Sequence, residues 1–227
     1  MGTILASAII NKAATLLLDE GNTRWTRTEL LQWLSQAQRV ISMRFPNMCN
    51  SLTILKLVAG TKQRLPPDGW LLLDVVRNMG TDGLTPGSAI RVVSQELVDS
   101  FDPAWHTITK VAAPDNFVYN PKDQTAFYVY PPADGTCYVE VNYAAVPPEL
   151  TAESSPIYVN DILEPTIVDY ICFRAHSKDA EYAAGVQLAS LYQNSFAQMT
   201  AAKDQAELQN QPNLDLAQFD PTVRGSA

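Results

Sequence analysis

The chain has 227 residues, with 16 basic and 24 acidic side chains and a net charge of −8. At about 100–200 residues per domain, this length predicts one large domain or one domain with an insertion. The acidic balance excludes the basic face that grips nucleic acid phosphates, but it suits a protein that DNA only passes. The sequence contains no run of about 18 apolar residues, so no membrane span is predicted. Its first residues lack the basic segment of a secretory signal, so no such signal is expected. Three scattered cysteines favour folding in a reducing compartment.

Residues 1–50 are predicted to form two helices. Apolar side chains recur at helical spacing from Ile4 to Leu17, and a second apolar face begins at Leu30. Thr26 and Glu29 form a capping box, in which the hydroxyl accepts a bond from a free amide at the start of the second helix.

Residues 51–159 are predicted to form a β-rich, antiparallel insertion. Residues 51–67 suggest a hairpin that reverses around Gly60. Residues 125–143 suggest a second hairpin, because apolar and polar side chains alternate on both sides of a turn at Gly135.

The chain is expected to become helical again from Asp161. Asp161 and Glu164 are spaced like a second capping box, with Pro165 in the first turn. About 40 residues then run without proline, which is long for one helix, so a break is expected near residues 177–179.

The expected fold class is therefore α+β: a discontinuous α-helical bundle with an inserted antiparallel β domain and an extended C-terminal arm. The two helical blocks are predicted to pack together as one body. The expected parts are the helical body, residues 1–50 and 160–210, the insertion, residues 51–159, and the arm, residues 211–227.

The best candidate for chemistry is a set of polar side chains on one face of the third helical segment. Asp169, Cys172 and His176 stand at i, i+3 and i+7. The cysteine and histidine could be two metal ligands, or a thiol with a base. The alternative is a small buried cysteine beside a surface histidine. Two ligands do not close a zinc site, so packing is the favoured interpretation.

The C-terminal helices are more apolar than a surface helix requires. Residues 162–173 place apolar side chains around nearly the whole helix, which must then be buried all round. Residues 188–206 carry a narrower apolar stripe. Two interpretations stay open: an ordinary core, or a subunit interface in a ring. The interface interpretation assigns contacts between subunits to Ile167, Ile171, Leu188, Leu191, Tyr192 and Met199.

Three stretches resemble the head-to-tail adaptor, or connector, proteins of short-tailed bacteriophages. They are WTRTELLQWLSQAQRVI, then LPPDGWLLLDVVRNMGTDGLTPGSAIRVV with the later FYVYPP and VEVNYAAVPP, and finally LEPTIVDYICFRAHSKDAEYA with YQNSF. Together they span about residues 3–200, and none of them is a catalytic motif.

The resemblance implies a helical body with a β insertion, assembled as a homo-oligomeric ring of about twelve copies on the portal protein. It implies a structural protein of the virion head-tail junction, made in the host bacterial cytoplasm, with neither enzyme activity nor a cofactor. The ring would extend the DNA channel, with the insertion facing the downstream tail protein.

In such adaptors an extended C-terminal segment commonly reaches the portal. Here the contacting residues would be Leu214, Leu216, Phe219, Val223 and Arg224. Two other classes of function remain open: a tail or baseplate module that does not touch the portal, and an enzyme that uses the cysteine–histidine face.

Overall fold

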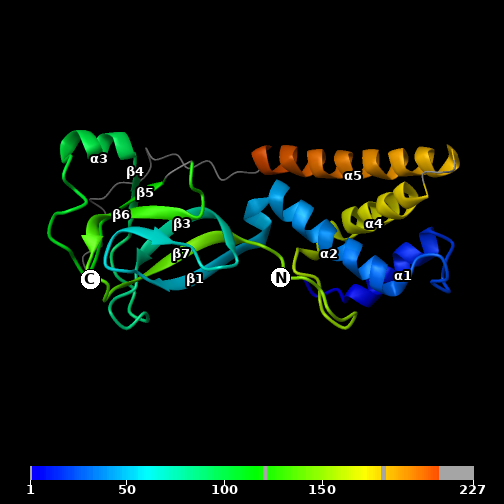
Figure 1. Ribbon diagram of the computed structural model, residues 1–227, viewed down its shortest axis with the longest axis horizontal. Coiled ribbons are helices and arrows are strands. Elements are labelled where there is room, and N and C mark those ends of the chain that lie inside the picture. Colours follow the sequence, from blue (N-terminus) through cyan, green and yellow to red (C-terminus); the bar gives the residue numbers. More distant parts are fainter. Residues whose placement is uncertain (1, 120–121, 180–182, 210–227) are drawn as a thin grey trace, which may run out of the picture.

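The computed structural model of the chain describes residues 2–119, 122–179 and 183–209. Figure 1 shows an elongated molecule, with helices gathered at one end and strands at the other. The predicted α+β class is confirmed.

The helices of the body are α1 (Ala6–Leu16), α2 (Arg27–Arg44), α4 (Glu164–Lys178) and α5 (Ala183–Gln209). As predicted, the Thr26 side chain accepts a hydrogen bond from the Glu29 amide and starts α2. The predicted break after α4 is also confirmed, since α5 folds back and packs along α4. α4 contacts α1, α2 and α5, so the chain buries most of this apolar helix by itself.

The segment that follows the last strand returns to the helical body. Leu150, Ile157 and Val159 are buried in the same core as the helices. The Ile157 amide donates to the carbonyl of Ile4 (2.9 Å), which ties this segment to the start of the chain. Residues 150–159 therefore lie against the helices, although their composition suggested the insertion.

The capping box expected at Asp161 is not formed. Asn160 is the cap instead: its side chain accepts from the Ile162 amide and starts a short 3-10 turn, η2 (Asp161–Leu163). The Asp161 carboxylate accepts from the Thr3 amide (2.8 Å) and hydroxyl (2.7 Å). A long-range contact has therefore replaced the local cap that the spacing suggested.

The β domain follows a 3-10 turn, η1 (Pro46–Cys49), and includes the short helix α3 (Gln95–Phe101). Its strands are β1 (Asn50–Lys56), β2 (Gly60–Arg64), β3 (Gly69–Asn78), β4 (Arg91–Val93), β5 (Asn116–Tyr119), β6 (Ala126–Ala133) and β7 (Tyr138–Ala145). Within the described residues they form two sheets, ordered β1-β7-β3 and β2-β6-β5-β4. The β4–β5 pair is parallel, which departs from the antiparallel expectation.

Both predicted hairpins are wrong, because β1 pairs with β7 and β2 pairs with β6. β1 and β2 act as one long strand that bends from one sheet into the other, and β6 and β7 do the same. The glycines mark these bends: φ is +121° at Gly60 and +93° at Gly135, a conformation that side chains with a Cβ rarely adopt. The predicted alternation does hold, since Phe127, Val129 and Val139 are fully buried between the sheets.

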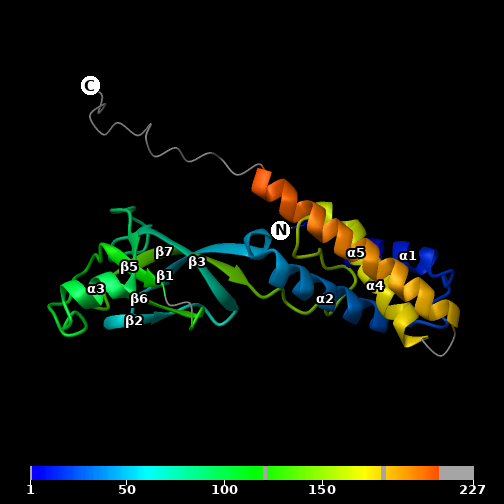
Figure 2. The ribbon, with the colours of Figure 1, turned by 90° about the horizontal axis from the view of Figure 1, so that it is seen from above.

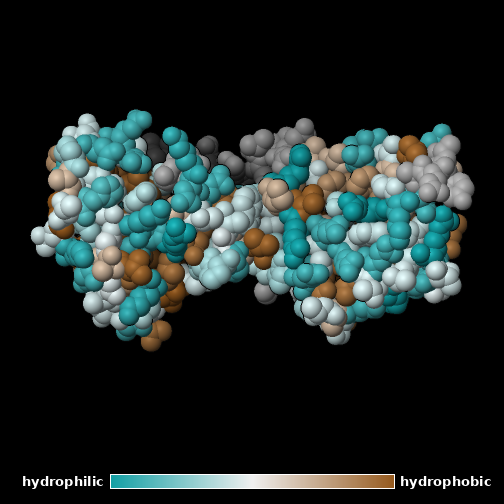
Figure 3. All heavy atoms as spheres, viewed as in Figure 1, coloured by the Kyte–Doolittle hydropathy of each residue, from teal (hydrophilic) through white to brown (hydrophobic). Residues whose placement is uncertain are grey.

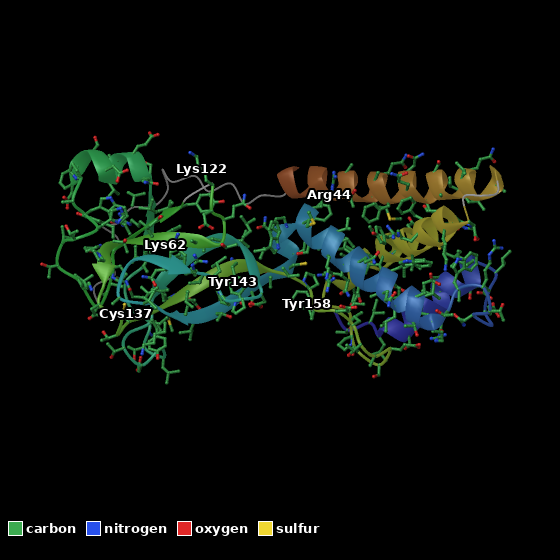
Figure 4. The ribbon with its side chains drawn as sticks, viewed as in Figure 1. Arg44, Lys62, Lys122, Cys137, Tyr143 and Tyr158 are labelled. Atoms are coloured by element: carbon green, nitrogen blue, oxygen red, sulfur yellow. The ribbon has the colours of Figure 1, made fainter. Side chains whose placement is uncertain are left out.

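Two connections join the body to the β domain, and tyrosines fill the junction (Figure 4). Tyr158 packs against both hydrophobic cores. The Tyr143 hydroxyl donates to Asp68 (3.2 Å), and the Ser42 hydroxyl donates to the Ala145 carbonyl (3.3 Å).

Candidate subunit interface

The six residues proposed for subunit contacts fall into two groups. Ile167 and Ile171 are fully buried inside the single chain, where they fill the helical core. Leu188, Leu191 and Met199 line α5 with 39%, 61% and 40% of their surface exposed. Tyr192 is half-buried against α4. The exposed group is therefore the one available to another molecule.

An open groove runs along α4 beside α1. Its floor is formed by Pro165, Val168 and Asp169, and the α1 wall includes Thr15 and the half-exposed Leu16. The hollow measures about 440 Å³. We call it the α4 groove.

α5 packs against α4 beside the α4 groove. The Ser195 hydroxyl donates to the Asp169 carboxylate (2.5 Å), and the Thr166 hydroxyl lies 3.4 Å from the Met199 sulfur. Further along α4, a hollow of about 370 Å³ is lined by Leu17 and Leu188, among others. One exposed α5 residue, Leu188, thus lines a hollow on α4, and Ser195 of α5 bonds to a residue of the α4 groove.

Three charged side chains line the α4 groove: Lys12 and Glu164, which form an ion pair with each other, and Asp169. Burial raises the pKa of the Asp169 carboxyl, and the hydrogen bond from Ser195 only partly offsets this effect. In the described ranges, no lysine or arginine forms an ion pair with Asp169. The groove therefore contains a half-buried carboxylate that lacks a cation.

The cysteine and histidine on the same helix serve packing. Cys172 is fully buried, and burial raises the pKa of its thiol to about 12, so it stays protonated at neutral pH. The His176 ring stacks on Tyr192 with 5.7 Å between ring centroids, and burial lowers its pKa. The described residues contain no group of three or more histidine, cysteine or acidic side chains that could hold a metal. This geometry favours the packing interpretation.

The family model of the SU10 adaptor protein matches residues 5–214, almost the whole chain. The chain belongs to this family. The resemblance seen in the sequence is thereby confirmed, and the protein is a structural adaptor of a phage. A comparison with curated proteins gave no match. No helix in the described part of the adaptor is long and apolar enough to cross a membrane.

The adaptor has a second exposed apolar surface at the outer end of the β domain. Phe101 is 85% exposed, and Val92 and Leu97 are exposed beside it. The fully buried Trp105 supports α3 from below, and its indole N–H donates to Asp99 (2.8 Å). The packing of Trp105 against Val98 thus anchors the helix that carries the exposed Leu97 and Phe101.

The residues predicted to contact the portal lie outside the described residues. They are Leu214, Leu216, Phe219, Val223 and Arg224. The sequence analysis missed the α1 side of the groove, because Leu16 matches the helical period of the core. Its exposure depends on how α1 and α4 cross, and no local pattern carries that information.

Proposed function

We propose that the adaptor assembles as a ring on the portal, extends the DNA channel and carries the tail, without an enzymatic step. The observation that carries this proposal is the α4 groove in a member of a phage adaptor family. Contiguous apolar surface in a protein that must stay in solution marks an interaction site. Here the half-exposed Leu16 lines the groove together with Pro165 and Val168, on helices whose inner faces form the core.

The C-terminal segment supports attachment to the portal. Residues 211–227 combine a few apolar side chains with two prolines and no helical period after α5. The apolar side chains of this segment offer anchors that a partner surface could bury. We assign the portal contact to this arm.

The overall charge supports a role beside DNA. A net charge of −8 repels the phosphates of a passing duplex, so the wall of a channel would not hold the genome back. α3 and the exposed apolar residues that it carries lie at the end of the molecule opposite the helical body (Figure 1). We assign the contact with the downstream tail protein to that end.

Light scattering behind a sizing column tests the ring. We expect a single species for the adaptor alone, and a complex with about twelve adaptors when the portal protein of the same genome is added. A monomer in both runs would overturn the proposal and favour a separate tail or baseplate module.

A truncated adaptor that lacks residues 211–227 tests the arm. We expect an unchanged circular dichroism spectrum and weaker attachment to the portal. A matched control replaces the apolar residues of the arm by serine at full length, which separates their contribution from that of chain length. Unchanged attachment in both variants would overturn the assignment.

A further inference from the structure

The outer side of α2 carries an exposed ridge that the fold does not explain. Gln36, Arg39, Val40 and Met43 stand at i, i+3, i+4 and i+7 and are all exposed, with Met43 at 73%. We call these four residues the α2 ridge. The inner side of the same helix is fully buried in the core, so the ridge is free to contact another molecule.

The α2 ridge and the α4 groove lie on different sides of the body. Seen from above, α1 and α2 flank the stacked α4 and α5 on opposite sides (Figure 2). The side on which α2 lies in front is largely hydrophilic over the helices, with small hydrophobic patches between polar residues (Figure 3). Two different surfaces on opposite sides of one molecule are what a head-to-tail contact requires, because each copy then uses one surface toward each neighbour.

We propose that the α2 ridge of one copy packs into the α4 groove of the next copy. This inference rests on the proposed ring and specifies which surfaces close it. A helix ridge with anchors at i, i+3, i+4 and i+7 is the shape that a groove between two helices receives. Met43 and Val40 would cover Leu16, Leu191 and the floor of the groove.

Charge complementarity supports the same pairing. Among the described residues, Asp169 has no lysine or arginine partner, since Lys12 of the same groove is paired with Glu164. Arg39 on the ridge is paired only loosely with the exposed Glu149, at 3.7 Å, and can turn toward a better partner. An Arg39–Asp169 contact between copies would be shielded by the apolar residues around it, where a carboxylate–guanidinium bond is stronger than at an open surface.

Cysteine cross-linking in the complex with the portal tests this contact. The full-length chain would carry Met43→Cys and Leu191→Cys, and all three native cysteines are buried. Because the two new thiols belong to different surfaces, oxidation should join neighbours into a ladder of dimers, trimers and larger species on a non-reducing gel. The matched control pairs Met43→Cys with Val186→Cys, which is also exposed on α5 but lies about 140° around the helix from Leu191.

The outcomes separate this inference from the ring itself. A ladder for the first pair and not for the control supports the contact. A complex of the expected mass without a ladder, or with dimers only, overturns the contact and leaves the ring intact. If light scattering shows no multimer on the portal, the ring and this contact both fail.

A second measurement addresses the charged pair. Arg39→Gln and Asp169→Asn should each raise the adaptor concentration needed for half-maximal ring assembly by about fivefold, and the double variant should be no worse than either single one. Asparagine retains the acceptor for Ser195, so the fold is preserved. Glu149→Gln is the control and should leave assembly unchanged. Additive losses in the double variant would overturn the pairing.

Discussion

The helical body and the β domain are each closed by contacts between distant parts of the chain, but the contacts differ in kind. In the body, ion pairs between side chains join a few isolated backbone bonds: Arg27 pairs with Glu153 (2.6 Å), and Lys178 pairs with Glu29 (2.6 Å). In the β domain, continuous backbone ladders make the long-range bonds, because each bent strand pairs with residues 62 to 94 positions away.

This difference determines what each region needs in order to fold. The β domain finds all its strand partners between Asn50 and Ala145. The body needs both ends of the chain, since α1 and α2 precede the insertion and α4 and α5 follow it. We therefore expect a substitution in one core to destabilise the region that contains it. A substitution at the junction or in an ion pair should instead weaken the contact between distant segments of the chain.

The largest effect is expected in the β core. Phe127→Ala removes a fully buried ring between the two sheets and should lower the free energy of unfolding by about 3–5 kcal/mol. Urea unfolding followed by circular dichroism measures the change. The control is Phe101→Ala, which truncates an exposed ring and should stay within about 0.5 kcal/mol of the parent. Similar losses for both variants would contradict the core described here.

The next effect concerns the joint between α4 and α5. A Cβ added at Gly185 would lie 2.6 Å from the Asp179 carbonyl oxygen, which is backbone and cannot easily move. Gly185→Ala should therefore cost about 1–3 kcal/mol by overpacking. Gly21→Ala is the matched control, because the nearest atom to its added Cβ is 3.7 Å away. A neutral Gly185→Ala would show that α5 can shift along α4.

The sequence predicted the features that depend on local rules. The Thr26 cap, the break after α4 and the alternation along β6 and β7 all follow from neighbours within a few residues. A helix makes its backbone bonds within one segment, so its period and its caps are sufficient to place it.

The errors concern partners that the local pattern does not identify. A glycine between two strands fits a reversal or a bend equally well, and Gly60 and Gly135 proved to be bends. Asp161 binds Thr3 across the whole chain instead of capping its own helix. For the interface, composition identified apolar helices, but only packing separates the buried Ile171 from the exposed Leu191.

A smaller effect is expected from the ion pair that ties α2 to the returning segment. The Arg27 guanidinium donates to both oxygens of Glu153, which lowers the pKa of that carboxyl. Both side chains are about one-third exposed, so solvent screening limits the loss in Glu153→Gln to about 0.5–1 kcal/mol. The difference from the parent should shrink as salt is raised. A loss that does not depend on salt would show that shape, and not charge, holds this contact.

The smallest effect at neutral pH is expected from two loop aspartates, one in each region. Asp19 accepts backbone amides of residues 23–25 in the helical body, and Asp82 accepts those of Leu84 and Thr85 in the β domain. These bonds favour the charged carboxylate and lower the pKa of each from 3.8 to about 2.

Because the pKa of each carboxyl is lower in the folded protein, its contribution to stability is full above about pH 4 and is lost as pH falls toward 2. Asp19→Asn and Asp82→Asn each remove the charge and one of the two acceptor oxygens, so both variants should unfold at a slightly lower urea concentration than the parent at pH 7. Between pH 4 and pH 2 each variant should lose less stability than the parent does. If only one variant flattens this pH dependence, the aspartate loops do not stabilise the two regions alike. A steeper decline in both variants would contradict the lowered pKa values, since the charged form of each side chain would then not be the one that the loops stabilise.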